Sequence, residues 1–464
     1  MAMAAPLWFP LLVIVLAAAA AASAPPAAAL VFPKEALPTK SGYLPIPSPN
    51  ASLYFAFYEA THPVTPPAST PLLVWLDGGP GYSSFLGNFF QIGPYLLSSS
   101  SNTTTSPSTV PLSPNPFAWN RRFGLLFLDS PLGTGYSAAP SVSAIPTNQS
   151  TVADHILAAL QSFLAAESPE LRARPLFLTG ESYGGKSIPT AGALILAANP
   201  SLPRGRRINL RGVAIGDGLV HPVAQVATHA EVAYGMGLIG DAQRREAEAM
   251  QREAVALARA ARWREASDAR AGILAWLQNA TGLPSLYDAE GAAASSLDAV
   301  AAGAAEVFND AGVRAALGAR RRADGGAPWQ LDNQAVEDAF HDDVMKSAKR
   351  EVDALLRSPG TRVLLYEGIR DVQDGAVAAE AWVRELEWDG LAAFRSAPRA
   401  VWRRSSGGGG GSRLAGYVQR HGALVHVAVY EAGHLVPASQ GAAAQEMIED
   451  WVFDKGMFGT TAAA

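Results

Sequence analysis

The strongest constraint on the fold is the alternation of short apolar runs with helical patterns along most of the chain. Six apolar runs end in turn residues and predict buried strands, whereas intervening segments such as 151–167 and 378–386 have helical periodicity. Such alternation indicates a mostly parallel sheet with helices on both faces, which is an α/β fold. Segments 42–46 and 52–58 alternate more strictly and predict an antiparallel hairpin at the sheet edge. The six runs are 71–76, 124–128, 175–179, 212–215, 362–366 and 424–430.

The alternation lapses between residues 220 and 350. Asp241 is expected to cap a long helix, rich in Ala, Arg and Glu, that runs toward Gln278. Further helices are expected around Val300 and Val336. We therefore predict that residues 220–350 form a helical cap inserted into the α/β core. The two parts of the core are residues 30–219 and 351–464.

The N-terminus has the features of an export signal. Residues 7–22 form one apolar run, and Ala22-Ser23-Ala24 has the small-residue spacing of a cleavage site, so residues 1–24 are predicted to be a signal peptide. The alternative is a membrane anchor, but the run contains Pro10 and is shorter than the roughly 20 residues needed to span a bilayer. We therefore expect the secretory pathway, an extracellular or vacuolar location and no stable membrane anchor after cleavage.

Composition limits the partners and the chemistry. Thirty-six basic residues against 41 acidic residues give a formal net charge of −5, so nucleic acid is not expected as the main partner. The absence of Cys excludes disulfides, thiolate metal sites and cysteine nucleophiles. Nothing in the sequence implies a metal or an organic cofactor, or defines an oligomeric state. Asn-x-Ser/Thr triplets, which are candidate glycosylation sites behind a signal peptide, occur at Asn50, Asn102, Asn148 and Asn279.

The motif Gly180-Glu181-Ser182-Tyr183-Gly184 lies between the predicted strand 175–179 and a helical pattern at 189–198. In a G-x-S-x-G motif the flanking glycines allow a sharp strand-to-helix turn, which projects the serine hydroxyl above the sheet. The start of the helix beneath it also favours developing negative charge. An ordinary glycine turn is the alternative, but the position between strand and helix favours Ser182 as a nucleophile.

A serine nucleophile needs a base and an acid, which follow it in the chain order Ser, Asp, His in this type of fold. His434 lies in a loop after the run 424–430, and Asp371 lies after the run 362–366. Both therefore stand at carboxyl ends of predicted strands, where open α/β sheets place their sites. Asp374 is the nearest alternative to Asp371 on spacing alone.

Acyl transfer also needs amide donors for the oxyanion. Trp75-Leu76-Asp77-Gly78-Gly79-Pro80-Gly81 follows the first core strand, where this fold takes one donor. We expect the amides of Gly79 and Tyr183 to be the pair. The alternative is a plain glycine-proline turn.

Together these residues resemble the serine carboxypeptidase family, in particular the plant serine carboxypeptidase-like proteins. The likeness runs from about Gly42 to Val452 and consists of six motifs in the family's order. It implies an α/β-hydrolase fold with a cap domain, and removal of C-terminal residues from peptides at acidic pH. The motifs are 75–84, Asn120 with 128–135, 180–185, 212–219, 366–371 and 432–437.

The resemblance also implies roles for individual residues. The family's triad maps onto Ser182, Asp371 and His434, and its oxyanion donors map onto Gly79 and Tyr183. Its pair that binds the terminal carboxylate of the substrate maps onto residues 77 and 181, here Asp77 and Glu181.

Three departures from the family pattern are informative. Family members usually carry Asn where Asp77 stands, and an ionised Asp repels a substrate carboxylate where an Asn amide would donate to it. Because Glu181 is expected close by, crowded carboxyls should raise at least one pKa and make binding favour low pH. Tyr82 replaces the family's Cys after the glycine turn, so that disulfide is absent. Ile369 replaces an acid near Asp371.

Two other functions remain open at this point. Plant acyltransferases resembling this family pass the acyl group to an alcohol instead of water, but they tend to carry Asp before the serine, where this chain has Glu181. A catalytically silent binding protein on the same scaffold would be consistent with Asp77 and the missing disulfides, but not with a complete triad. A serine-type carboxypeptidase is therefore the leading prediction.

Overall fold

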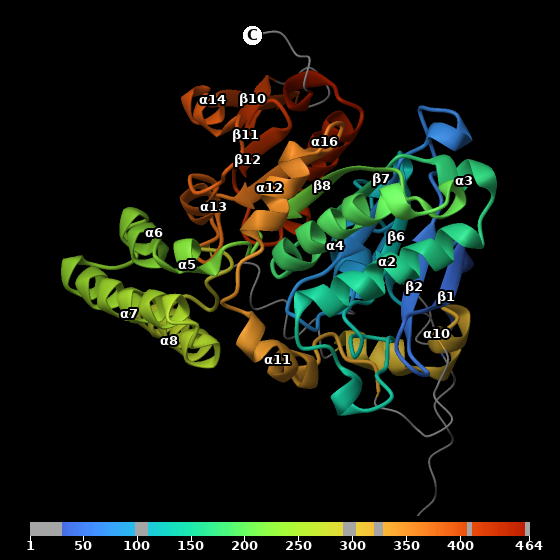
Figure 1. The fold of residues 1–464 in the computed structure, drawn as a ribbon, viewed down its shortest axis with the longest axis horizontal. Coiled ribbons are helices and arrows are strands. Elements are labelled where there is room, and N and C mark those ends of the chain that lie inside the picture. Colours follow the sequence, from blue (N-terminus) through green and yellow to red (C-terminus); the bar gives the residue numbers. More distant parts are fainter. Residues whose placement is uncertain (1–29, 98–109, 291–302, 320–327, 406–410, 460–464) are drawn as a thin grey trace, which may run out of the picture.

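The computed structural model describes residues 30–97, 110–290, 303–319, 328–405 and 411–459 (Figure 1). Within these residues, a ten-stranded sheet has the order β1-β2-β6-β3-β7-β8-β9-β12-β11-β10. Its strands are β1 Lys40–Pro45, β2 Ser52–Tyr58, β3 Leu72–Leu76, β6 Gly124–Leu128, β7 Leu176–Glu181, β8 Leu210–Gly216, β9 Arg362–Gly368, β10 Ala400–Ser405, β11 Ser412–His421 and β12 Leu424–Val429. A small separate sheet pairs β4 Tyr95–Leu97 with β5 Leu112–Pro114.

The centre of the large sheet is parallel. Strands β6, β3, β7, β8, β9 and β12 pair in parallel register, and they are the six apolar runs from which the α/β fold was predicted. The β1–β2 hairpin is antiparallel and lies at one edge, as the stricter alternation of its residues indicated. The predicted fold class is therefore confirmed.

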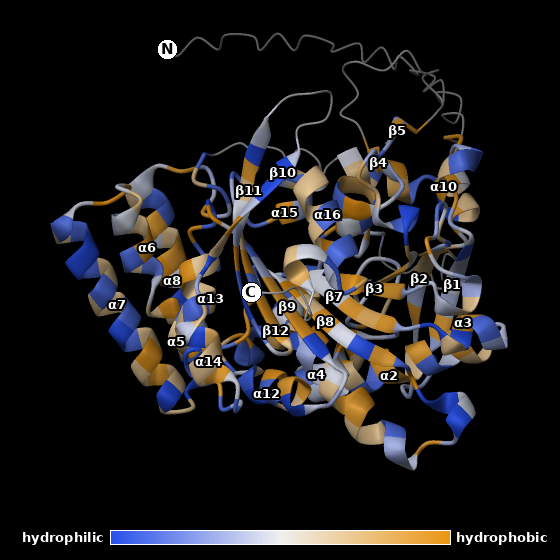
Figure 2. Cartoon of the chain, turned by 90° about the horizontal axis from the view of Figure 1, so that it is seen from above, coloured by the Kyte–Doolittle hydropathy of each residue, from blue (hydrophilic) through white to orange (hydrophobic). Residues whose placement is uncertain are grey.

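Each central strand contributes to two apolar cores because successive side chains point to opposite faces of the sheet. In β3, Leu72 and Val74 belong to one core, whereas Leu73 and Trp75 belong to the other. Helices α2, α4 and α12 cover the first face, and α16 covers the second (Figure 2). The sheet is thus buried on both sides, which explains why its strands read as continuous apolar runs.

The helices in chain order are α1 Phe85–Gly87, α2 Gln149–Ala165, α3 Pro169–Ala173, α4 Gly184–Ala198, α5 Pro222–Val226, α6 His229–Gly235, α7 Asp241–Arg259, α8 Trp263–Thr281, α10 Ala311–Ala316, α11 Gln334–Phe340, α12 Lys349–Arg357, α13 Ala376–Val383, α14 Leu391–Ser396, α15 Val436–Ser439 and α16 Gly441–Val452. Those from α5 to α8 lie beside the sheet, with α7 and α8 projecting from it (Figure 1).

The expectation of one helix from Asp241 toward Gln278 is wrong. The chain reverses between α7 and α8, where Ala261 adopts a left-handed φ of 56°. The two helices then pack together and bury small and apolar side chains in a third core, which a single straight helix would leave exposed. The N-cap is Gly240, whose amide donates to Gln243, so Asp241 is instead the first helical residue.

Other predictions for this region have different outcomes. Val336 lies in α11 as expected, whereas Val300 lies outside the described residues. The third core, which includes Val226, Ile273 and Leu277, belongs mainly to helices between β8 and β9. The predicted cap boundary at residue 350 falls inside α12, which packs against α4 and β9.

The N-terminal predictions fall on residues that the structure does not describe. The expected signal peptide at 1–24 and the triplet at Asn102 both lie outside the described ranges. Among the helices of the described ranges, none combines the length and the apolar character needed to cross a membrane.

Candidate active site

Ser182 stands at a sharp turn between β7 and α4. Its φ is 56°, a left-handed conformation that non-glycine residues adopt rarely and that is typical of a strained nucleophile turn. The residues after β3 approach this turn very closely, since a Cβ added to Gly78 would lie 2.6 Å from the Cβ of Ser182 and 3.0 Å from its Oγ. Glycine at position 78 is therefore required for this approach.

His434 and Asp371 are in direct contact. Nδ1 of His434 lies 2.7 Å from Oδ2 of Asp371, and both side chains are buried. The other oxygen of Asp371 accepts hydrogen bonds from the amides of Gln373 and Asp374, at 2.8 and 3.2 Å. Nε2 of His434 is buried and has no hydrogen-bond partner within the described part of the chain. The imidazole is thus oriented through one nitrogen, and the other is available.

Asp374, the alternative acid, faces other partners. Its Oδ1 accepts from Gln225 at 3.0 Å, and its Oδ2 lies 3.3 Å from the guanidinium of Arg270 on α8. Its amide, not its carboxylate, contacts Asp371. The carboxylate that touches the imidazole is therefore that of Asp371.

The two expected oxyanion donors flank the serine turn. Neither the amide of Gly79 nor that of Tyr183 donates a hydrogen bond within the described residues. Gly79 has a φ of 103°, so a side chain there would be strained. Tyr183 precedes α4, and its hydroxyl donates to Asp343 at 2.9 Å, which anchors the side chain while the amide stays free. Two unpaired amides beside a serine can stabilise an oxyanion.

Asp77 and Glu181 form a pair of buried carboxyls beside the serine. Oδ2 of Asp77 accepts from the amide of Gly87 at 3.2 Å, and Oε1 of Glu181 accepts from the amide group of Gln91. The second oxygen of each carboxyl is buried without a partner in the described ranges. Burying two carboxyl oxygens without partners is costly, which favours protonation of the pair.

Burial and mutual proximity decide the charge of these groups. Burial, together with the charge of Glu181, raises the pKa of Asp77 well above its usual range. Burial also raises the pKa of Glu181 to about 7, although Gln91 and His434 oppose the change. Burial alone would lower the pKa of His434, but the charge of Asp371 outweighs it and raises that pKa above the ordinary histidine value. The site therefore retains protons at mildly acidic pH.

A dependence of stability on pH follows. A carboxyl whose pKa is higher in the folded state binds more protons when folded, so stability decreases as pH rises from the unfolded to the folded pKa. For Glu181 this window runs from 4.5 to about 7. We expect the Tm to fall by about 2 °C or more between pH 5 and pH 7.5 in calorimetry. Glu181→Gln should reduce this fall, and an equal fall in the variant would contradict the assignment.

Two residues at this site were not anticipated from the sequence. Tyr287 stacks on His434 with ring centroids 4.3 Å apart and planes 17° apart, and its carbonyl accepts from the His434 amide at 2.7 Å. No sequence pattern marks Tyr287, which lies in the loop after α8. Asp217 lies beside Asp371 and follows β8, so its position at the carboxyl end of a strand was a signal that could have been used.

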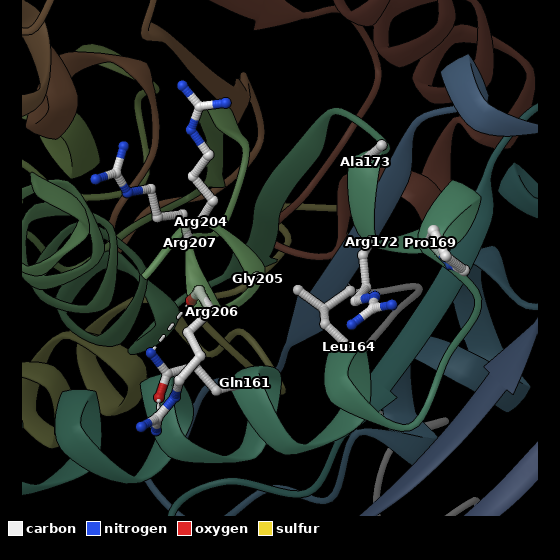
Figure 3. Close-up of a pocket in the computed structure, with 9 residues that line it drawn as sticks. All are labelled: Gln161, Leu164, Pro169, Arg172, Ala173, Arg204, Gly205, Arg206 and Arg207. Carbon is white, nitrogen blue, oxygen red and sulfur yellow. Dashed lines mark hydrogen bonds between the residues drawn. The ribbon is translucent and has the colours of Figure 1, made fainter. Parts of the chain in front are cut away.

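A hollow of about 350 Å³ lies near the amino ends of β7 and β8, at the end of the sheet away from Ser182 (Figure 3). The residues around it precede β7 and β8, whereas Ser182 and its neighbours follow the strands. Arg206 donates to Gln161 at 2.9 Å, and Figure 3 shows Arg204 and Arg207 pointing away from Arg172. The arginine side chains around the hollow do not converge on one point, so we assign no role to this hollow.

Three of the four glycosylation triplets lie in the described residues. Asn50 and Asn279 are exposed, and Asn148 is half-buried at the N-cap of α2, where its Oδ1 accepts from the Thr151 amide at 3.0 Å. A side-chain oxygen used as a cap leaves the amide nitrogen of Asn148 available.

Comparison with known proteins decides the family. A family model described as serine carboxypeptidase matches residues 31–454. The chain belongs to the serine carboxypeptidase family. Serine carboxypeptidase-like 50 of Arabidopsis thaliana is 45% identical over 430 residues, which cover 92% of this chain and 90% of the relative. Probable serine carboxypeptidase CPVL of Homo sapiens is 28% identical, covering 92% and 85% of the two chains.

A solved serine carboxypeptidase has the same fold. Kex1(delta)p, a prohormone-processing carboxypeptidase from Saccharomyces cerevisiae, superposes with a TM-score of 0.77 and 23% identity, covering 91% of this chain and 93% of its own. The fold is therefore the α/β-hydrolase fold. Membership of the serine carboxypeptidase family makes this chain a serine-type carboxypeptidase that acts on peptides.

Proposed function

We propose that this enzyme releases C-terminal residues from peptides at acidic pH through Ser182, His434 and Asp371. His434 takes the proton of the Ser182 hydroxyl as the oxygen attacks the scissile carbonyl, and Asp371 stabilises the imidazolium that forms. The amides of Gly79 and Tyr183 stabilise the tetrahedral oxyanion. His434 returns the proton to the leaving amine, and water then hydrolyses the acyl-enzyme.

The observation that supports this assignment best is the contact between His434 Nδ1 and Asp371 Oδ2, which leaves Nε2 without a partner. The Ser182 turn, Asp371 and His434 follow β7, β9 and β12, and β8 alone separates β7 from β9 in the sheet. Catalytic hydrogen bonds in a site without substrate are often long, so an unpaired Nε2 is consistent with a base awaiting substrate.

An assay with blocked dipeptides at pH 4–6, beside sugar esters with an alcohol acceptor, tests the reaction type. Release of the C-terminal amino acid supports the peptidase. Acyl transfer from the esters alone would show an acyltransferase. Absence of both products, together with absence of labelling by a fluorophosphonate, would show a catalytically silent binding protein.

We propose that Asp77 and Glu181 bind the terminal carboxylate of the substrate through shared protons. Their partner-free oxygens and raised pKa values support this role. Below pH 7 the pair carries protons that it can donate to a carboxylate, whereas at higher pH it repels one. The KM of a blocked dipeptide should therefore be about tenfold lower at pH 5 than at pH 7.5.

The substitution Asp77→Asn tests this binding mode, because an amide donates hydrogen bonds at every pH. It should lower the KM at pH 7.5 by about threefold to tenfold and flatten its dependence on pH. The matching dipeptide amide, which lacks the carboxylate, is the control and should show no such dependence. An equal change in KM at both pH values would refute the proton-shared mode.

We propose also that the protein enters the secretory pathway and resides outside the cell or in the vacuole, with residues 1–24 removed and glycans on the Asn-x-Ser/Thr triplets. The export features of the N-terminus and the exposure of Asn50 and Asn279 support this. The third core supports a helical cap at about residues 220–350. Mass spectrometry of protein purified from its native tissue measures both the mature N-terminus and the glycans.

A further inference from the structure

Asp217 is a buried carboxylic acid that the mechanism above does not use. It is fully buried at the end of β8, where its φ is 40°. Oδ1 accepts a hydrogen bond from the amide of Gly368 at 2.9 Å. Oδ2 is buried and has no hydrogen-bond partner among the described residues. A buried oxygen without a partner is costly, so its protonation state needs an explanation.

The carboxyl group of Asp217 lies beside Asp371 and His434, two residues of the proposed catalytic site. One ligand atom from each of Asp217, Asp371 and His434 lies within 4.8 Å of the others, and all three residues are buried. Two carboxylates so close together in a dry environment cannot both be ionised. One of the two carboxyls therefore holds a proton.

The hydrogen bonds decide which carboxyl is ionised. Asp371 is stabilised as an anion by His434 and by the amides of Gln373 and Asp374. Asp217 has one donor, the amide of Gly368. Because donors stabilise the charged form, Asp371 carries the negative charge and Asp217 carries the proton. The Asp371 carboxylate can accept a hydrogen bond from the protonated Asp217 carboxyl.

We propose that Asp217 is a positioning residue which, as a neutral acid, donates a hydrogen bond from Oδ2 to Asp371 and holds that carboxylate against His434. This inference rests on the proposed function, because it assigns Asp371 as the group that orients the catalytic imidazole. Asp217 acts through Asp371 and does not touch the substrate.

The surrounding charges favour the neutral form. Burial raises the pKa of Asp217 well above its usual range, and the charges of Asp371 and Glu367 raise it further. The Tyr366 hydroxyl interacts electrostatically with Asp217, but it donates its hydrogen bond to the carbonyl of Gly180. The nearby basic side chains already contact other carboxylates. His426 contacts Glu367 at 2.6 Å, and Arg270 contacts Asp374 at 3.3 Å. Among the described residues, no Lys or Arg pairs with Asp217.

The pH profile of kcat at saturating blocked dipeptide separates a neutral from an ionised Asp217, because saturation removes the effect of Asp77 and Glu181 on KM. Asn is also neutral, can donate to Asp371 and tolerates a left-handed φ. Asp217→Asn should therefore leave the acidic limb, which reports His434, at the same pH. It should shift the alkaline decline upward by about one unit or more, because the donor no longer ionises.

Asp217→Ala removes the donor and should lower kcat about tenfold with little change in KM. Exposed Asp389→Asn is the matched control and should reproduce the wild-type profile. A downward shift of the acidic limb in Asp217→Asn would show that Asp217 is ionised and would overturn the proposal. So would an Asp217→Ala variant with wild-type kcat and an unshifted profile.

Infrared spectroscopy tests the proton without turnover. In a Ser182→Ala background at pH 6, adding Asp217→Asn should remove one carbonyl band of a protonated carboxylic acid, and Asp389→Asn should remove none. If neither Asp217→Asn nor Asp389→Asn removes such a band, the proposal is wrong. If the wild-type protein turns over no peptide, the proposed function fails, and the infrared result still decides the state of Asp217.

Discussion

Replacing Ser182 with Ala is expected to lower kcat for blocked dipeptides by about a million-fold, because the acyl-enzyme can no longer form. The residual rate would come from the oxyanion donors and from substrate binding, which Ala leaves in place. The measurement is kcat at pH 5, combined with covalent labelling by a fluorophosphonate, which should be lost in the variant.

Ser187→Ala provides the matched control. Ser187 lies on α4, close to Ser182 in the chain, and its hydroxyl donates to Gln149 at 3.0 Å. Loss of this bond should change kcat by no more than about threefold, with labelling retained. Labelling or turnover that survives in Ser182→Ala would show that another residue is the nucleophile.

Asp371→Asn is expected to lower kcat by about ten-thousand-fold with little change in KM. In the proposed mechanism the Asp371 carboxylate, which contacts Nδ1, holds the His434 proton there and leaves Nε2 to accept the serine proton. An Asn amide would donate to Nδ1 instead, which places the imidazole proton on Nε2 and disables the base. Steady-state kinetics at pH 5 measure the effect.

Asp374→Asn distinguishes the two candidate acids. It weakens the contact with Arg270 but leaves the Asp371–His434 contact intact, so kcat should fall by about tenfold or less. Both variants should keep their Tm close to that of the wild type to make the comparison valid. If Asp374→Asn lost as much activity as Asp371→Asn, the assignment of the acid would be wrong.

The contrast between these two acids shows what the sequence could predict. Asp371 and Asp374 follow the same strand, so spacing alone placed both at the carboxyl edge of the sheet, and only the family resemblance pointed to Asp371. The choice depends on Arg270, which reaches Asp374 from α8, 104 residues earlier in the chain. Contacts between such distant segments leave no local pattern.

The same difference between local patterns and distant contacts explains which strands and helices could be predicted. The six central strands could be predicted because burial on both faces makes each one a continuous apolar run. The turn between α7 and α8 could not, since residues 260–262 contain neither Gly nor Pro and Ala261 supplies the left-handed conformation. Tyr287 was missed because stacking on His434 depends on where a loop of irregular structure lies.

The stacking of Tyr287 on His434 restricts how groups can reach Nε2. The phenol ring covers one face of the imidazole and hinders tilting toward that side, so the departing amine and the incoming water both meet Nε2 along the same direction in the ring plane. They cannot occupy that space together. In the proposed mechanism the released amino acid must therefore leave before a water molecule enters, and at high concentration we expect it to compete with water for the acyl group and re-form the peptide bond.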